Sequence, residues 1–137
     1  MQKRFVVCYK ERDYSKLNVV EAVKVLGNVK GCDVLVVDDI IDTAGTVAKV
    51  CRALKKKGAR KVYFACSLPM FNGPAIKRLN DLHNKHLLDL VIGTDAIHHG
   101  DDFEKKHKWF RTASVVGYFA KVINNLNKCM SISKLLE

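Results

Sequence analysis

Seven residues within one short stretch carry groups suited to binding a charged, hydroxyl-rich ligand. Asp38 and Asp39 follow a run of apolar residues, and the turn Asp42-Thr43-Ala44-Gly45-Thr46 comes shortly after them. Ala44 and Gly45 have little or no side chain, which lets a ligand approach the main chain closely. The threonine hydroxyls and the backbone amides are donors, and each charge-assisted bond to a phosphate contributes roughly 1.5–3 kcal/mol. The turn therefore predicts a phosphate-binding site.

The two aspartates need a different role, because carboxylates this close would repel a bare phosphate. The vicinal hydroxyls of a sugar suit Asp38 and Asp39, either directly or through a magnesium ion. The alternative is that these acids are helix caps or solvated loop residues, which is the commoner case for a lone Asp-Asp pair. The whole string favours binding, and the ligand that we infer is a phosphorylated sugar.

Two elements are predicted to position this stretch. Val34–Val37 is an uninterrupted apolar run, which is typical of a strand buried on both faces in a parallel sheet. The helix predicted after the turn ends before Gly58, and its apolar positions have helical spacing at Val47, Val50, Cys51 and Leu54. Ligands of open α/β sheets bind beyond the carboxyl ends of the strands, where this turn lies.

The string VLVVDDIIDTAGT resembles the signature shared by type I phosphoribosyltransferases and ribose-phosphate pyrophosphokinases (phosphoribosyl pyrophosphate synthetases). The variant Asp-Thr-Ala-Gly-Thr is closest to the pyrophosphokinases. The resemblance covers nearly all of the chain but only about the carboxyl half of that family's usual polypeptide. It implies the type I phosphoribosyltransferase fold, with the Thr43–Thr46 turn holding the 5-phosphate of ribose 5-phosphate and Asp38 and Asp39 taking the ribose hydroxyls.

Near the amino terminus, Lys10 and Arg12 follow the β-prone run Phe5–Tyr9. They match the Lys-x-Arg triplet that opens a mobile catalytic loop in the pyrophosphokinases. The resemblance implies that these two cations are catalytic and stabilise the charge of a transferring diphosphoryl group, as positioned cations do. The alternative is a pair of solvated charges at the end of a strand.

The remaining pattern predicts an α/β fold with a mainly parallel sheet flanked by helices. We expect Asn72 to cap a helix that runs to about Leu82. Further strands are expected over residues 19–26, 61–67, 87–94 and 109–115, a loop over 98–108, and a last helix over about 116–125.

Two segments depart from or add to the family pattern. Phe71–Ile76 resembles the family's aromatic-(Ser)-Gly-Pro-Ala-Ile segment, but Leu68 stands where the family usually has a histidine. This substitution puts any contact of that imidazole in doubt. The loop over 98–108 contains three histidines and several acids. Their spacing fits no common ligand pattern, so we predict a solvated loop there and no metal site.

The composition is that of an ordinary soluble globular domain, with 48% hydrophobic and 28% charged residues. The net charge of +10 accompanies no nucleic-acid motif, so we expect a solvated basic surface and no nucleic-acid partner. No apolar run approaches a membrane span, and no secretory signal core opens the chain, so we expect no membrane association and a cytoplasmic location. Five scattered cysteines indicate reduced thiols.

We assign residues 1–137 to one phosphoribosyltransferase-like, carboxyl-terminal domain, and we expect the family's amino-terminal domain to be absent. The resemblance implies ATP as co-substrate with Mg²⁺, whose ligands would lie mostly outside this chain, and a homo-oligomer. We interpret the chain as a truncated piece, a fragment or a mis-predicted gene product, and we expect it to be inactive alone. Three functions remain open: part of a pyrophosphokinase that makes phosphoribosyl pyrophosphate and AMP, a phosphoribosyltransferase that consumes phosphoribosyl pyrophosphate, and a non-catalytic regulatory subunit associated with the synthetase.

Overall fold

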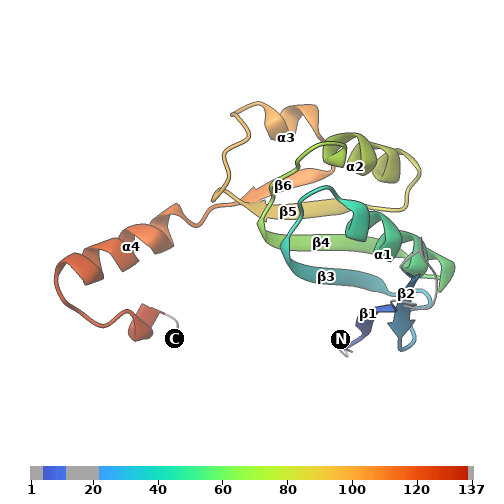
Figure 1. Cartoon of the computed structure of the whole chain (residues 1–137), viewed down its shortest axis with the longest axis horizontal. Coiled ribbons are helices and arrows are strands. Elements are labelled where there is room, and N and C mark those ends of the chain that lie inside the picture. Colours follow the sequence, from blue (N-terminus) through green and yellow to red (C-terminus); the bar gives the residue numbers. More distant parts are fainter. Residues whose placement is uncertain (1–4, 12–21, 136–137) are drawn as a thin grey trace.

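The computed structural model describes residues 5–11 and 22–135 of the chain. Two sheets and several helices make up this part (Figure 1). The strands are β1 (Val7–Glu11), β2 (Ala22–Leu26), β3 (Asp33–Ile40), β4 (Lys61–Leu68), β5 (Leu90–Thr94) and β6 (Phe110–Ala113). The helices are α1 (Gly45–Lys56), α2 (Ala75–Asn84), α3 (Phe103–Lys106), α4 (Val116–Asn127) and a short 3-10 turn, η1 (Ser133–Leu135).

The main sheet confirms the predicted parallel α/β architecture. Its strands lie in the order β3-β4-β5-β6 and all neighbours pair in parallel, with Val36 opposite Phe64 and Ala65 opposite Ile92. Because each crossover of this kind is right-handed and the order advances in one direction, α1 and α2 lie on the same face of the sheet (Figure 1). Strands β1 and β2 form a separate antiparallel pair.

The core lies between that face and the two helices. The predicted apolar positions of α1 are all buried, and the inward residues of β4, among them Val62 and Phe64, are fully covered. Leu79 and Leu82 of α2 are buried in the same layer, beside the residues of α1. Each such side chain contributes roughly 1.5–3 kcal/mol to the stability of the fold when it is fully buried. This apolar layer therefore fixes the position of α1 relative to β3.

The end of α1 confirms the predicted stop signal. Gly58 has a left-handed φ of +84°, and its amide donates to Lys55 while the amide of Ala59 donates to Leu54. This pair of bonds is the Schellman arrangement that satisfies the last carbonyls of a helix. The chain then returns directly into β4.

The expectation that β3 is buried on both faces is wrong for the described part of the chain. Leu35 is 58% exposed and Val37 is 75% exposed, because they point to the face opposite α1 and α2. Val34 and Val36, on the helix side, are half-buried. Among the described residues, no helix covers that second face; Figure 1 shows α4 leading away from the sheet.

Several element boundaries differ from the sequence prediction, and three of the differences concern the segments around α2 and β5. Strand β5 begins at Leu90, three residues late, because Leu87 and Leu88 still belong to the connection whose amides bond to Leu82 at the end of α2. Helix α2 runs to Asn84, beyond the expected end. The loop over 98–108 is not wholly solvated, because it contains α3 and packs rings into the fold.

Those rings form a ring cluster that consists of Phe71, His99, Phe103, His107, Trp109 and Phe110. His99 stacks between Phe71 and Phe103, with ring centroids 5.0 and 4.7 Å away. Trp109 is buried and its indole donates to Asn80 Oδ1 at 2.6 Å. The predicted solvated histidines at 99 and 107 are therefore packing residues.

The cysteines and the helices add two plain findings. All five thiols are free, as predicted, and two of them, Cys51 and Cys66, are buried. Burial raises the pKa of the Cys51 thiol to about 12. Within residues 5–11 and 22–135, no helix is both long and apolar enough to cross a membrane.

Candidate functional site

The two aspartates of the candidate site belong to β3 itself, since the strand runs on to Ile40. Asp38 is half-buried and lies opposite Cys66 of β4, and Asp39 is exposed. Asp38 Oδ1 accepts the amide of Asp39 at 3.0 Å, and Asp39 Oδ1 accepts the amide of Ile40 at 2.9 Å. These bonds fix both carboxylates at the carboxyl end of the strand, the edge at which α/β proteins bind ligands.

The turn that follows has open main-chain donors. Ala44 is the residue before α1, has a left-handed φ of 56°, and makes no side-chain capping bond. Its carbonyl accepts the amide of Ala48, but the amides of the range Asp42–Thr46 have no acceptor among the described residues. Consecutive unpaired amides at a helix amino terminus favour an anion, so the geometry of the turn agrees with a phosphate ligand.

The loop after β4 holds this turn in place. The amide of Ile41 donates to Leu68 at 3.0 Å, and Ile41 in turn accepts the amide of Phe71 at 3.1 Å. Asn72 makes two contacts with Asp42: its amide bonds to the carbonyl at 3.0 Å, and its Nδ2 donates to Oδ1 at 2.8 Å. The turn thus rests on a second loop of the same sheet edge.

The role expected for Asn72 is therefore wrong. The residue before α2 is Pro74, no side chain caps that helix, and the Asn72 amide group faces Asp42 instead. The Asn72 carbonyl does accept the amide of Ala75. An asparagine two residues before a proline looks like a cap in sequence, but the competing carboxylate 30 positions away is visible only in the fold.

Arg78 is a second residue that sequence reasoning missed. It lies on the exposed side of α2, and its Nη1 donates to the carbonyl of Thr43 at 2.8 Å. A Cβ added at Gly45 would lie 3.7 Å from the same nitrogen, an ordinary van der Waals contact, so the guanidinium also lies beside the first residue of α1. Helix periodicity places Arg78 on a polar face, which gives no signal of this contact.

The thiol of Cys66, the neighbour of Asp38 on β4, has a pKa that is shifted by its surroundings at the strand end. Burial, the larger cause, and the negative charge of Asp38, the second cause, raise the pKa of the Cys66 thiol to about 11. The thiol is therefore neutral at physiological pH, and the charged groups of the strand end are the two carboxylates.

The predicted catalytic pair lies largely beyond what the structure describes. Lys10 is part of β1, opposite Val23 of β2, but its side chain is outside the description. Arg12 lies outside the described residues. The role of both residues stays a prediction from the sequence.

The donor set for a metal is small in this chain. Asp38 and Asp39 offer the hard carboxylate oxygens that Mg²⁺ prefers. Among the described residues, however, no group of three or more His, Cys, Asp or Glu side chains is placed to hold a metal ion. The residues fit a contribution of one or two ligands to a magnesium ion and no complete cage.

A parallel sheet with an acid-bearing strand end and an open turn before a helix is typical of α/β domains that bind ligands at the carboxyl edge of the sheet. The family described as "Phosphoribosyl transferase domain" matches residues 1–106. This chain belongs to that family.

Individual proteins of known name are also similar to this chain in sequence. The chain is 37% identical over 122 residues to a protein of Chlorobaculum tepidum named "Ribose-phosphate pyrophosphokinase", covering 89% of this chain and 36% of the relative. A protein of the same name from Bacillus subtilis is 37% identical over 120 residues, covering 88% and 36%. The chain thus spans about a third of the length of these relatives.

A solved structure shows the same fold. The crystal structure of phosphoribosylpyrophosphate synthetase from Mycobacterium smegmatis superposes with a TM-score of 0.70 at 26% identity, covering 88% of this chain and 36% of that chain. The fold class inferred from sequence, a parallel sheet flanked by helices and similar to the phosphoribosyltransferases, is confirmed.

Proposed function

We propose that this chain is the carboxyl-terminal, phosphoribosyltransferase-like domain of a ribose-phosphate pyrophosphokinase. The parent protein transfers diphosphate from MgATP to ribose 5-phosphate and yields phosphoribosyl pyrophosphate and AMP. Relatives with that name at 36–37% identity support the proposal. So does the match to the synthetase fold.

One observation carries the assignment to this chain's own residues. Unpaired amides of the range Asp42–Thr46 lie directly after a strand that ends in Asp38 and Asp39. In the proposal the amides and the hydroxyls of Thr43 and Thr46 bind the 5-phosphate, and the two carboxylates accept hydrogen bonds from the ribose hydroxyls.

The transfer step would depend on residues at the other end of the chain. Lys10 and Arg12 would stabilise negative charge on the diphosphoryl group as it moves, Lys10 as a point charge and Arg12 through a bidentate fork. Mg²⁺ bound with ATP would supply the remaining charge neutralisation. Most ligands of ATP and Mg²⁺ would belong to parts of the parent protein that this chain does not contain.

Two further properties belong to the proposal. The parent would assemble as a homo-oligomer and would act in the cytoplasm on ribose 5-phosphate and ATP. The oligomer is implied by the resemblance to the pyrophosphokinases, and the location is an expectation from the sequence. Sedimentation of the full-length parent would test the first of them.

Titration calorimetry of this chain with ribose 5-phosphate tests the site directly. We expect measurable but weak binding, because the turn supplies the phosphate contacts while other ligand contacts are missing, and we expect ATP to bind scarcely at all. Asp39→Asn should weaken ribose 5-phosphate binding about 3- to 10-fold, because the asparagine oxygen still accepts a neutral hydrogen bond and only the charge assistance is lost.

Asp101→Asn is the matched control, since Asp101 is an exposed carboxylate in the loop before α3. It should leave the affinity unchanged. Equal effects of the two substitutions would mean that charge alone is being measured and would refute the site. In the full-length parent, Asp38→Asn should lower the use of ribose 5-phosphate; unchanged kinetics would discard the role of Asp38.

Product identification in the parent protein separates the proposed activity from its nearest alternative. Release of AMP from ATP supports a pyrophosphokinase. Release of pyrophosphate that depends on an added base would instead indicate a phosphoribosyltransferase that consumes phosphoribosyl pyrophosphate.

A further inference from the structure

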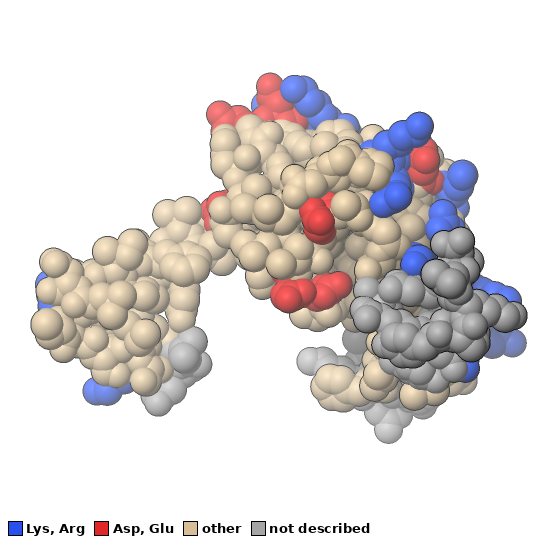
Figure 2. Space-filling view, in the orientation of Figure 1, with Lys and Arg blue, Asp and Glu red and all other residues tan. Residues whose placement is uncertain are grey.

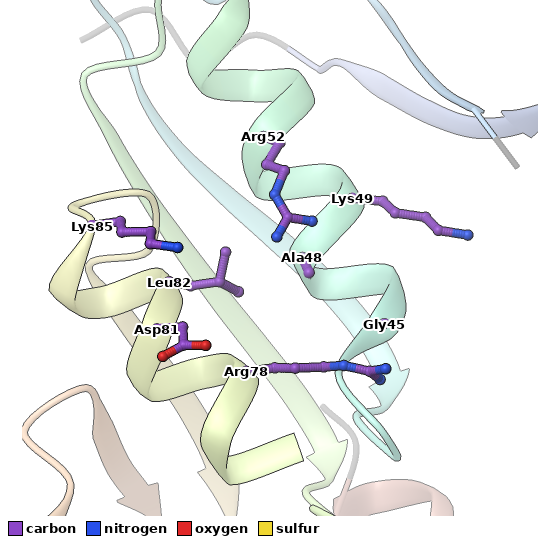
Figure 3. Close-up of a pocket in the computed structure, with 8 residues that line it drawn as sticks. All are labelled: Gly45, Ala48, Lys49, Arg52, Arg78, Asp81, Leu82 and Lys85. Atoms are coloured by element: carbon purple, nitrogen blue, oxygen red, sulfur yellow. The ribbon is translucent and has the colours of Figure 1, made fainter. Parts of the chain in front are cut away.

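A groove lies between the outer sides of α1 and α2, with the sheet behind it (Figure 3). Its volume is about 230 Å³, and its floor contains the apolar side chains of Ala48 and Leu82. The rim is formed by charged residues of both helices: Lys49, Arg52, Arg78, Asp81 and Lys85. Gly45 is shared with the site proposed for ribose 5-phosphate, and Arg78 contacts that site through the carbonyl of Thr43; the other rim residues do not belong to it.

Cations outnumber acids around this groove. Figure 3 shows Arg52 reaching from α1 toward α2 and Lys85 reaching from α2 toward α1, while Lys49 extends away from α2. Among the described lining residues other than Lys49, the cations Arg52, Arg78 and Lys85 therefore outnumber the single carboxylate, Asp81. Figure 2 shows that Lys and Arg side chains gather on the side of the molecule that carries α1 and α2, whereas the α4 end shows few charges.

Several of these charges lack a protein partner. Within the described part of the chain, Arg52, Asp81 and Lys85 take part in no ion pair, and the side chains of Arg52 and Lys85 donate no hydrogen bond. Arg78 is different, because its Nη1 donates to the carbonyl of Thr43 at 2.8 Å. That bond uses one of five guanidinium donors and orients the rest.

We propose that this groove is a second anion site, which binds a diphosphate group between α1 and α2. Arg52 on α1 and Arg78 on α2 present the forked donors that match phosphate oxygens in pairs, and Lys85, at the end of α2, adds a point charge. An elongated anion can contact cations on both helices, whereas a single small ion would meet fewer of them. The short apolar floor suits a compact ligand.

Inorganic pyrophosphate is the probe, measured by titration calorimetry on the chain saturated with ribose 5-phosphate so that the turn is occupied. The double variant Arg52→Gln/Lys85→Gln removes one groove cation from each helix and leaves Arg78 in place. Glutamine is a good helix former, so the fold should be retained. We expect pyrophosphate affinity to fall at least 10-fold.

The matched control is Lys56→Gln/Lys77→Gln, which removes the same charge from exposed positions of the same two helices outside the groove. It should change the affinity less than 2-fold. Equal losses in the two double variants would show diffuse attraction to a basic surface and would overturn the proposal. So would an absence of pyrophosphate binding to the unmodified chain at millimolar concentration.

A substitution in the opposite direction sharpens the test. Asp81→Asn removes the only carboxylate of the groove and should tighten pyrophosphate binding about 2- to 5-fold; weaker binding would contradict the proposed location. Uridine diphosphate carries the same group on a nucleoside. Equal affinities for the two ligands would identify the free diphosphate as sufficient, and tighter binding of uridine diphosphate, lost in Arg52→Gln/Lys85→Gln, would identify a nucleotide ligand of the same groove.

The ribose 5-phosphate titration separates this proposal from the proposed function. If Arg52→Gln/Lys85→Gln loses pyrophosphate but keeps ribose 5-phosphate, the groove is a distinct site. If it loses ribose 5-phosphate binding to the same extent, the groove and the turn are one site and the present inference fails.

Discussion

Two loops at the same edge of the sheet are built in opposite ways. The turn after β3 is polar and open, with unpaired amides between Asp42 and Thr46 among the described residues. The loop after β4 is closed: Pro69 is fully buried, Phe71 is 6% exposed and joins the ring cluster, and Pro69 O lies 2.6 Å from His99 Nε2. The first loop leaves backbone amides without an acceptor among the described residues, and the second pairs its polar groups within the fold.

The difference shows how an open site is made stable. Unpaired amides and a left-handed alanine at position 44 cost free energy and persist only where the surroundings impose them. The loop after β4 supplies that restraint through its bonds to Ile41 and Asp42. Its own rigidity comes from the rings beneath it. The ring cluster therefore supports the candidate site without touching a ligand.

Phe71→Ala breaks this support at its centre and should have the largest effect. Loss of a buried phenyl ring costs about 3–5 kcal/mol in free energy of unfolding, because Phe71 contacts several rings of the cluster. Urea unfolding measures the change. Met70→Ala is the control, since Met70 is 38% exposed in the same loop, and it should change stability by about 0.5 kcal/mol or less. Similar losses would refute the division between the two loops.

Gly93→Ala tests how tightly the closed loop packs on β5. A Cβ at this position would lie 2.9 Å from both Phe110 Cε2 and Pro69 Cγ. Overpacking of this kind costs about 1–3 kcal/mol. Gly117→Ala in α4 has open space around it and should not destabilise the chain. A neutral Gly93→Ala in urea unfolding would show that the loop after β4 can yield.

Asn72→Ala cuts the side-chain bond between the loops. The expected loss of stability is about 0.5–1.5 kcal/mol, toward the lower end since Asn72 is exposed. The variant should also weaken ribose 5-phosphate binding, because Asp42 and the turn become less ordered. Asn127→Ala, at the exposed end of α4, is the control for both readouts. Loss of stability with unchanged ribose 5-phosphate binding would separate the closed loop from the site.

Much of this arrangement follows from local sequence. The apolar spacing of α1, its stop at Gly58 and the mainly parallel sheet were predicted from patterns within short segments, and these predictions were correct. The acids of the site are conspicuous for the same reason. Contacts between segments left no local trace: the bond from Asn72 to Asp42 and the bond from Arg78 to Thr43 each join residues 30 or more positions apart.

Burial was harder to predict from sequence than strand identity. Val34–Val37 has the composition of a strand covered on both faces, yet Leu35 and Val37 are exposed in the described structure. Periodicity reports which residues suit a core, whereas coverage depends on which other segments are available to pack. The histidines at 99 and 107 show the converse. They belong to a polar segment of the sequence, yet His99 stacks on Phe71 and His107 packs against Phe103.

The smallest expected effect is a pH dependence of the ring cluster. Burial among the rings, and to a lesser degree Lys106, lowers the pKa of His107 from its usual 6.5. The unfolded chain then binds a proton more readily than the folded chain, so stability is complete above about pH 6.5 and falls as the pH drops through the lowered folded-state pKa. His107→Gln should reduce this loss of stability, measured by urea unfolding between about pH 7.5 and 5.5.

Acidic groups with shifted pKa values do not interfere in this interval. The acids with lowered pKa values, Asp33, Asp95 and Glu104, have ordinary pKa values of 3.8 to 4.5, so their contributions to stability are lost only at lower pH. His98→Gln, at an exposed position of the same loop, is the control. If the His107→Gln variant and the unmodified chain lose the same stability over this interval, His107 is not the source of a pH dependence in the ring cluster.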